Sequence, residues 1–242
     1  MTRDLDIQSH PSPNFGARRD GVTRPSLVLI HYTAMQSAGA ALERLCDPAH
    51  EVSAHYLIDA TGSCLQLVAE TERAWHAGRG RWGDVTDVNS HSIGIELDNR
   101  GNTPFAHAQM NALEQLLSGI LARWDIAAQN VIGHCDIAPT RKTDPGVRFD
   151  WQRLARAGLA VWPATAPPTD TDLAADLAAD LAAFARNAAC FGYDPDLTPD
   201  QTLAAFRLRF SPRASGPLTP REAAMMADLA RRFPVDRHSA LT

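Results

Sequence analysis

The chain has 242 residues, of which 45% are hydrophobic and 21% are charged, and its formal net charge is −5. This length and composition are typical of a globular protein with one large domain, or with one medium domain and a small appendage. The weak negative charge is spread along the chain and provides no basic surface, so we expect neither nucleic acid nor anionic lipid as a partner.

The N-terminal region and the cysteines bear on the cellular compartment. No stretch approaches the roughly 20 apolar residues that cross a bilayer, and the polar start of the chain does not resemble a secretion signal. The chain has four cysteines and no CxxC spacing, which argues against a disulfide framework and against a cysteine-rich zinc module. We therefore expect a cytoplasmic protein, with the periplasm as the alternative if an export signal is missing.

Strand and helix signals alternate through the first two thirds of the chain. Helices are expected at 38–46 and at 104–124, the second with Thr103 as N-cap and Pro104 in its first position. Such alternation predicts an α/β domain with a mixed sheet flanked by helices. Short apolar or alternating runs predict strands at 27–30, 53–58, 92–97 and 130–133.

The composition changes near residue 162. Segment 163–172 is rich in Pro, Thr and Asp and is predicted to be a linker between a domain at 1–162 and a second domain at 173–242. A threefold Asp-Leu-Ala-Ala repeat follows, and Thr-Pro pairs at 198–199 and 219–220 are typical helix starts. The second domain is predicted to be a small three-helix module.

Three polar residues could bind a catalytic metal ion. His31 ends the apolar run LVLI, His134 ends NVIG, and Asp144 precedes Pro-Gly in a loop that can fold back. Side chains at strand ends usually face one crevice of an α/β sheet, and three protein ligands leave a fourth position for water on a catalytic zinc. Each residue also has an ordinary interpretation, because a histidine can form hydrogen bonds at a strand end and DPG is a good turn. Spacing alone does not decide between them.

The successive motifs LVLIHYTA, VSAHYLID, AWHAG, NSHSIGIELDN and GHCDIAPTRKTDPG resemble those of zinc-dependent N-acetylmuramoyl-L-alanine amidases of the AmpD/AmiD type, over roughly residues 12–160. The resemblance implies an amidase-2 fold with a mixed sheet flanked by helices. It implies one zinc ion held by His31, His134 and Asp144. It also implies that Glu96 is the catalytic acid and base, and that Lys142 stabilises the transition state.

The same resemblance implies the substrate. Family members hydrolyse the amide between the lactyl group of N-acetylmuramic acid, or its 1,6-anhydro form, and L-alanine of the peptidoglycan stem peptide. His76 and Asn89 match motifs of the substrate cleft, and the C-terminal helices resemble a peptidoglycan-binding module, although a purely structural packing module is equally consistent with them. On the strand SIGIEL, Glu96 shares a face with Gly94, so it can point into a pocket.

Other interpretations stay open at this point. Glu96 could be a solvent-facing strand carboxylate, and Lys142 could be an ordinary loop lysine. A peptidoglycan-recognition protein would bind the same ligand without cutting it, but the full set of catalytic residue types favours an enzyme. An unrelated metallopeptidase would release amino acids from plain peptides. The preference between anhydro and ordinary sugars and the oligomeric state are not determined by the sequence.

Overall fold

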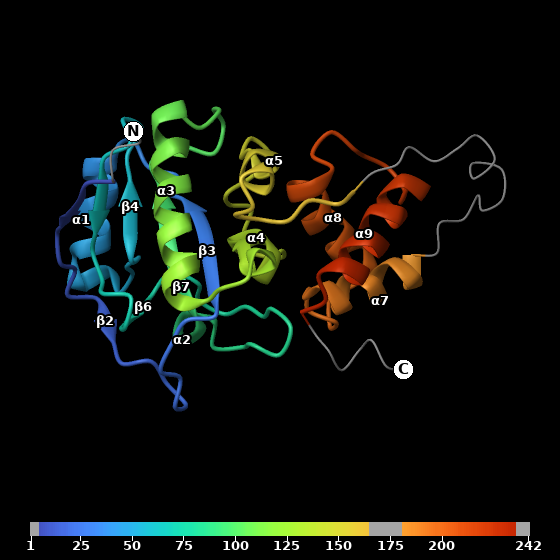
Figure 1. The fold of residues 1–242 in the computed structure, drawn as a ribbon, viewed down its shortest axis with the longest axis horizontal. Helices are drawn as coiled ribbons and strands as arrows, with labels where there is room; N and C mark the ends of the chain where they lie inside the picture. The colour runs from blue at the N-terminus through green and yellow to red at the C-terminus, as the bar shows by residue number, and fades with distance from the viewer. Residues whose placement is uncertain (1–4, 165–180, 236–242) are drawn as a thin grey trace.

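The computed structural model describes residues 5–164 and 181–235. A mixed six-stranded sheet forms the centre of the N-terminal part, and helices cover it (Figure 1). Its strand order is β1-β5-β4-β7-β3-β8. The strands span Ile7–Ser9 (β1), Leu27–Tyr32 (β3), Tyr56–Ile58 (β4), Cys64–Gln66 (β5), Ser92–Leu97 (β7) and Val131–Gly133 (β8). The expected α/β class with a mixed sheet is confirmed.

Four parallel strands form the part of the sheet that carries the polar residues of interest. Strands β4, β7, β3 and β8 run parallel, whereas β5 is antiparallel to β4. A separate antiparallel pair consists of β2 (Phe15–Gly16) and β6 (Arg73–Ala74). Since parallel strands end at the same edge, the C-terminal residues of β3 and β7 and the residue that follows β8 lie together.

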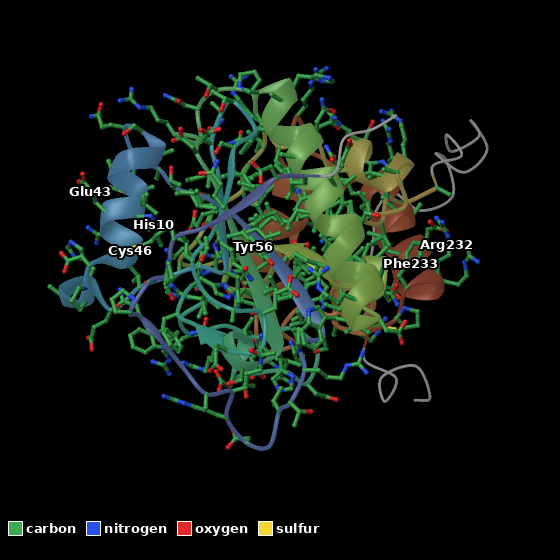
Figure 2. The ribbon with its side chains drawn as sticks, turned by 60° about the vertical axis from the view of Figure 1, so that its left-hand side comes forward. His10, Glu43, Cys46, Tyr56, Arg232 and Phe233 are labelled. Atoms are coloured by element: carbon green, nitrogen blue, oxygen red, sulfur yellow. The ribbon has the colours of Figure 1, made fainter. Side chains whose placement is uncertain are left out.

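A different set of helices packs on each face of the sheet. One face packs against α3 (His107–Trp124) and α5 (Trp151–Arg156), and Tyr56 lies in this interior (Figure 2). On the other face, α1 (Ala38–Cys46) packs on Leu57 of β4, and Leu29 of β3 contacts a cluster that extends into the C-terminal helices. Alternation along β3 places His31 on the same face as Leu29, between these two groups.

Shorter elements complete the N-terminal part. Two four-residue helices, α2 (Val88–His91) and α4 (His134–Ile137), adjoin β7 and β8, and two 3₁₀ turns span Pro48–His50 and Ala128–Asn130. Among residues 5–164 and 181–235, no helix combines the length and the apolar character needed to cross a membrane.

Within residues 181–235, three helices lie beside α4 and α5, beyond the β8 edge of the sheet (Figure 1). They are α7 (Leu181–Phe191), α8 (Pro199–Phe210) and α9 (Pro220–Arg232). Thr198 and Thr219 cap α8 and α9 as expected, each with a reciprocal hydrogen bond to the third helical residue. The three helices expected for the C-terminal module are present within residues 181–235. Most of the predicted linker and of the Asp-Leu-Ala-Ala repeat lies outside the described residues, so the domain boundary stays a prediction.

The start of α3 differs from the sequence prediction. Thr103 and Pro104 do not begin the helix, because α3 starts at His107 after Ala106, and Ala106 has extended backbone angles. The Asn99 side-chain amide donates to the carbonyl oxygens of Thr103 and Pro104, which keeps this segment in a loop. Phe105 is also held away from the helix by an edge contact with Phe149. Competing tertiary contacts therefore override a good local helix start.

Candidate metal centre and catalytic cleft

Three elements bring the predicted metal ligands together. His31 lies near the end of β3, and His134 is the first residue after β8, next to it in the sheet because Ile30 pairs with Gly133. Asp144 returns in the loop after α4, where the Cys135 backbone N–H donates to the Asp144 carbonyl oxygen at 2.9 Å. Gly133 is required here because a Cβ atom would lie 2.7 Å from the Pro145 ring. The fold thus closes the loop onto the two strand ends.

The three side chains form a compact, buried triangle of ligand atoms. Nδ1 of His31 lies 3.0 Å from Nδ1 of His134, and Oδ2 of Asp144 lies 2.9 Å and 3.1 Å from these two nitrogens. Donor atoms that each lie about 2 Å from a tetrahedral zinc ion are roughly 3.3 Å apart. Within the described part of the chain, these residues form a group that could hold a metal ion.

The outer nitrogens of both rings have partners that orient the inner ones. Nε2 of His134 lies 2.8 Å from the Ala77 carbonyl oxygen, so it carries the proton and leaves the lone pair of Nδ1 facing inward. Nε2 of His31 lies 3.1 Å from Nδ1 of His76, whose own Nε2 contacts the Ser92 hydroxyl at 3.3 Å. Both hydrogen bonds of His76 form when its Nδ1 accepts from Nε2 of His31 and its Nε2 donates to the Ser92 hydroxyl oxygen. Both inner nitrogens are then free to bind a cation.

The electrostatics of the triangle suit a divalent cation. Burial lowers the pKa of His31 to about 4, so its ring is neutral at pH 7. Burial opposes ionisation of Asp144 as well, but its contacts with His134 and His31 outweigh burial and lower the pKa of this carboxyl. The ionised Asp144 carboxylate gives the site negative charge, which a divalent ion would offset.

Glu96 lies beside the triangle on the neighbouring strand. It pairs with His31 across β3 and β7 and with Leu57 across β4, so it shares their face of the sheet. Burial, followed by the negative charge of Asp144, raises the pKa of Glu96 to about 8. Its buried Oε2 has no hydrogen-bond partner. A carboxyl with one buried, unpartnered oxygen beside potential metal ligands is suited to exchanging protons with a ligand in the cleft.

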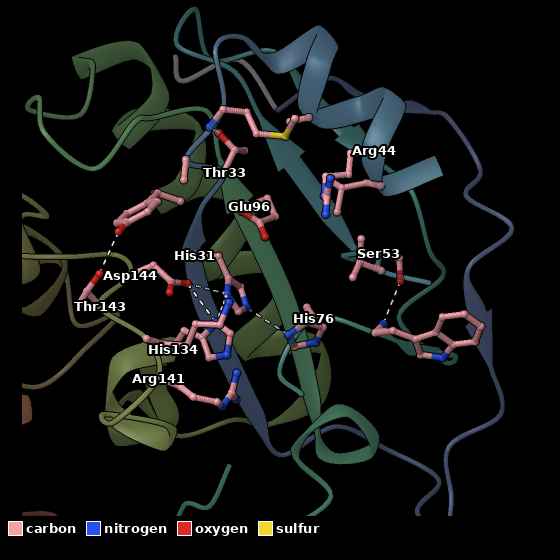
Figure 3. A pocket seen from close by; sticks show the side chains of 18 residues that line it. His31, Thr33, Arg44, Ser53, His76, Glu96, His134, Arg141, Thr143 and Asp144 are labelled. Carbon is pink, nitrogen blue, oxygen red and sulfur yellow. Dashed lines mark hydrogen bonds and ion pairs between the residues drawn. The ribbon is translucent and has the colours of Figure 1, made fainter. Parts of the chain in front are cut away.

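A cleft of about 450 Å³ opens over these groups and matches the usual size of a small-molecule site (Figure 3). Lys142 lines it and lowers the pKa of Glu96 through its positive charge. Arg44 and Arg141 lie on opposite sides of the cleft (Figure 3), so it is positively charged around the buried carboxylates. Such a cleft suits a ligand with carboxylate groups.

The two residues predicted to bind substrate occupy different settings. His76 lines the cleft but contacts His31, and Gly94 on β7 makes room for its ring, since a Cβ there would lie 2.4 Å from it. Asn89 is buried, and its Oδ1 accepts from the backbone N–H groups of His76 and Ala77. It also lines an adjoining pocket. A substrate-binding role for both stays a prediction.

Sequence reasoning missed several polar contacts around this site. Arg141 donates to the Ala77 carbonyl oxygen, and the buried carboxylate of Asp136 contacts Tyr193 and Arg209 of the C-terminal part. Asp136 lies inside the motif GHCDIAPTRK, but its partners are 57 and 73 residues away in the chain. Cys135 is buried within α4.

Comparison with known proteins gives one consistent match. The family model of N-acetylmuramoyl-L-alanine amidase matches residues 21–147. The chain is 40% identical over 220 residues to N-acetylmuramoyl-L-alanine amidase AmiD of Escherichia coli K12, covering 78% of this chain and 76% of that protein. It is 37% identical over 161 residues to 1,6-anhydro-N-acetylmuramyl-L-alanine amidase AmpD of Citrobacter freundii, covering 60% of this chain and 86% of AmpD.

Comparison with solved structures gives matches of the same kind. The complex of E. coli AmiD with anhydro-N-acetylmuramic acid-L-Ala-D-gamma-Glu-L-Lys superposes with a TM-score of 0.75 at 36% identity, covering 89% of this chain and 93% of AmiD. AmpDh3 from Pseudomonas aeruginosa, in complex with anhydromuramic pentapeptide, gives a TM-score of 0.72 at 31% identity and covers 93% of this chain and 96% of that one. Both matches extend over the C-terminal helices as well as the sheet.

Proposed function

The chain belongs to the N-acetylmuramoyl-L-alanine amidase family, and we propose that it hydrolyses the amide between the lactyl group of N-acetylmuramic acid, or its 1,6-anhydro form, and L-alanine of a peptidoglycan stem peptide. The observation that carries this proposal is the convergence of His31, His134 and Asp144 beside Glu96, whose buried Oε2 has no hydrogen-bond partner. The set of residue types that the reaction needs is complete. A protein that only binds the ligand would not need it.

We propose zinc as the metal, held by His31, His134 and Asp144. Two nitrogens and one oxygen in a tight triangle are a donor set typical of catalytic zinc. The bound ion would lower the pKa of water and polarise the scissile carbonyl group. The buried, oriented imidazoles and the ionised carboxylate supply the site, and their outer hydrogen bonds fix the ring orientations.

The protein groups around the site provide proton transfer and charge stabilisation. In its ionised form, Glu96 accepts a proton from the attacking water and donates it to the departing L-alanine nitrogen, so that the amide C–N bond breaks with a neutral amine leaving. The Lys142 ammonium group, in the same cleft, stabilises negative charge as it develops on the carbonyl oxygen. The raised pKa of Glu96 makes it a good proton donor in the second half of this cycle.

The cleft also supports the choice of substrate. Arg44, Arg141 and Lys142 line it, and stem peptides carry free carboxylates that these cations can pair with. His76 and Asn89 are proposed to contact the sugar side, where the adjoining pocket begins. Muramyl-peptide-bound structures of AmiD and AmpDh3 show that relatives of this fold accept such ligands.

Mass spectrometry of a muropeptide digest tests the proposal. We expect the protein to release intact stem peptide and the free muramyl sugar, to lose this activity in a chelator and to regain it with zinc. The control substrate is the same stem peptide without sugar, which should stay intact. Cleavage of the plain peptide would indicate a peptidase, and binding of muropeptide without cleavage would indicate a recognition protein.

The C-terminal helices and the cellular location are the subjects of two further predictions. Residues 1–162 contain every side chain assigned to the reaction, and we propose that the helices of 173–242 bind peptidoglycan, which cosedimentation with insoluble cell-wall material would test. The cytoplasmic location stays a prediction that cell fractionation would test.

A further inference from the structure

A buried carboxylate joins the metal site to the C-terminal helices. Asp136 is two residues after His134, is completely buried, and accepts three hydrogen bonds. The donors are the Gly133 backbone N–H at 2.8 Å, the Tyr193 hydroxyl at 2.8 Å and Nη1 of Arg209 at 3.0 Å. Two of these three donors belong to the C-terminal part, because Tyr193 follows α7 and Arg209 lies in α8.

Arg209 is buried in the interior of the protein. Both side chains of its ion pair with Asp136 are fully buried. Its Nη2 donates to the Val131 carbonyl oxygen at 3.2 Å, and its guanidinium carbon lies 4.2 Å from the centre of the Trp151 ring. A single side chain of α8 thus contacts β8, α4 and α5. A buried ion pair adds little stability over an apolar pair of similar size. The ion pair of Arg209 and Asp136 is therefore better explained by its effect on the positions of β8, α4 and α5.

The contacts of Asp136 act on the backbone that carries His134. Gly133 immediately precedes His134, and the bond from its N–H to Asp136 fixes the first turn of α4. Two residues further on, the Cys135 N–H donates to the Asp144 carbonyl oxygen and so holds the loop that carries Asp144. Rotation of this turn would therefore displace two of the three ligand atoms together.

A second contact region joins the C-terminal part to the loop that follows Ala77. Trp82 is fully buried and packs edge-on against Phe191 and Tyr193. The Gly83 N–H donates to the Gly192 carbonyl oxygen at 2.7 Å, and a Cβ added at Gly192, where φ is +133°, would lie 2.4 Å from the Trp82 ring. The same loop begins near Ala77, whose carbonyl oxygen accepts from Nε2 of His134.

We infer that the C-terminal helices orient the metal site, with Tyr193 and Arg209 as positioning residues that set the geometry of His134 through Asp136. The helices are then part of the catalytic unit, whatever else they bind. This inference rests on the proposed metal site. It goes beyond the proposed reaction because it gives a role in metal binding to a part of the chain that contributes no ligand.

The test compares metal binding in the full-length chain and in three variants. Tyr193→Phe removes only the hydroxyl and keeps the ring that packs on Trp82, and Arg209→Lys keeps the charge but loses the planar fork. The matched control is Phe184→Leu, which reduces a buried side chain of the same C-terminal cluster that contacts Phe206 and donates no hydrogen bond to Asp136. Zinc affinity is measured by competition with a chelator, the cobalt-substituted protein by visible absorption, and unfolding by calorimetry.

We expect Tyr193→Phe to raise the zinc dissociation constant about 10-fold and to change the cobalt spectrum, with a larger effect for Arg209→Lys. The Phe184→Leu control should lower the melting temperature while its zinc affinity and cobalt spectrum stay those of the wild type. Unchanged zinc affinity and cobalt spectrum in both Asp136-contact variants would overturn the inference. So would an equal loss of affinity in the control. Wild-type protein that binds no zinc would instead overturn the proposed function.

Discussion

His31 and Glu96 face each other across the parallel strands β3 and β7, and one belongs to the ligand triangle while the other has a buried oxygen without a partner. The sheet register therefore holds the proposed proton carrier at a fixed distance from the proposed metal. Since the two strands are buried in the middle of the sheet, this relationship does not depend on a mobile loop.

Glu96→Gln should separate activity from stability. We expect muropeptide hydrolysis to fall 10²–10⁴-fold, because Gln cannot carry the proton. Burial raises the pKa of Glu96 to about 8, so folding must protonate this carboxyl and costs free energy above pH about 4.5, its unfolded pKa. The metal-free variant should thus be more stable at pH 7, by roughly 3 kcal/mol. Near-normal turnover with zinc retained would show that another group carries the proton.

Lys142→Met should change the pH profile as well as the rate. The Lys142 charge lowers the pKa of Glu96, so its removal should raise that pKa and move the acidic limb of kcat/KM to higher pH. The maximal rate should also fall, since the carbonyl oxygen loses a cation. Rates measured from about pH 5 to about pH 9 check both effects. A lower rate with an unmoved limb would leave Lys142 a role in charge stabilisation alone.

His55 should make the metal-free protein less stable in mild acid. Its Nδ1 accepts from the Gly94 N–H and its Nε2 donates to the Glu72 carbonyl oxygen, and burial lowers its pKa to about 4. Below about pH 6.5 the unfolded chain binds a proton at His55, whereas the native chain binds one there only below about pH 4. The free energy of unfolding therefore falls as the pH drops through this range.

The expected contribution of His55 is about 2 kcal/mol between pH 7 and pH 5. Urea unfolding of wild type and His55→Gln at both pH values isolates it, because the other titrating groups are common to the two proteins. The variant should show a smaller loss on acidification. Equal losses in both proteins would mean that His55 is protonated in the native state.

Gly94→Ala should weaken metal binding through His76. The added Cβ would lie 2.4 Å from the His76 ring, so the ring must move and its contact with Nε2 of His31 is lost. We expect a zinc affinity weaker by about 10-fold or more. Gly119→Ala in α3 is the matched control, because the added Cβ would meet only the Arg123 side chain, at 3.5 Å. This substitution should stabilise the helix by about 1 kcal/mol. Wild-type zinc affinity in Gly94→Ala would assign His76 to the substrate alone.

The sequence is sufficient to predict where His31 and His134 lie, because each follows an apolar run that has to be a buried strand. It is also sufficient for the caps of α8 and α9, whose Thr-Pro starts use only local hydrogen bonds. The predicted start of α3 is wrong because Asn99 and Phe149 compete for the same segment. The contact between His31 and His76 depends on space above Gly94, which no local pattern encodes.

The role of Asp136 is hidden from the sequence for the same reason. Within its motif it looks like any loop carboxylate, and only the fold brings Arg209, 73 residues later, into contact with it. Long-range polar contacts of this kind leave no periodicity in the sequence. The family resemblance implies the ligand set and the expected reaction, but not the residues that orient them.

Zinc titration of metal-depleted protein, with release of the muramyl sugar followed by mass spectrometry, tests the central claim most directly. Three ligands around one ion predict that hydrolysis rises linearly with added zinc and stops rising at about one equivalent per chain. His134→Ala should show no such rise. Full hydrolysis by the metal-depleted protein, or hydrolysis that keeps rising to about two equivalents, would contradict the account.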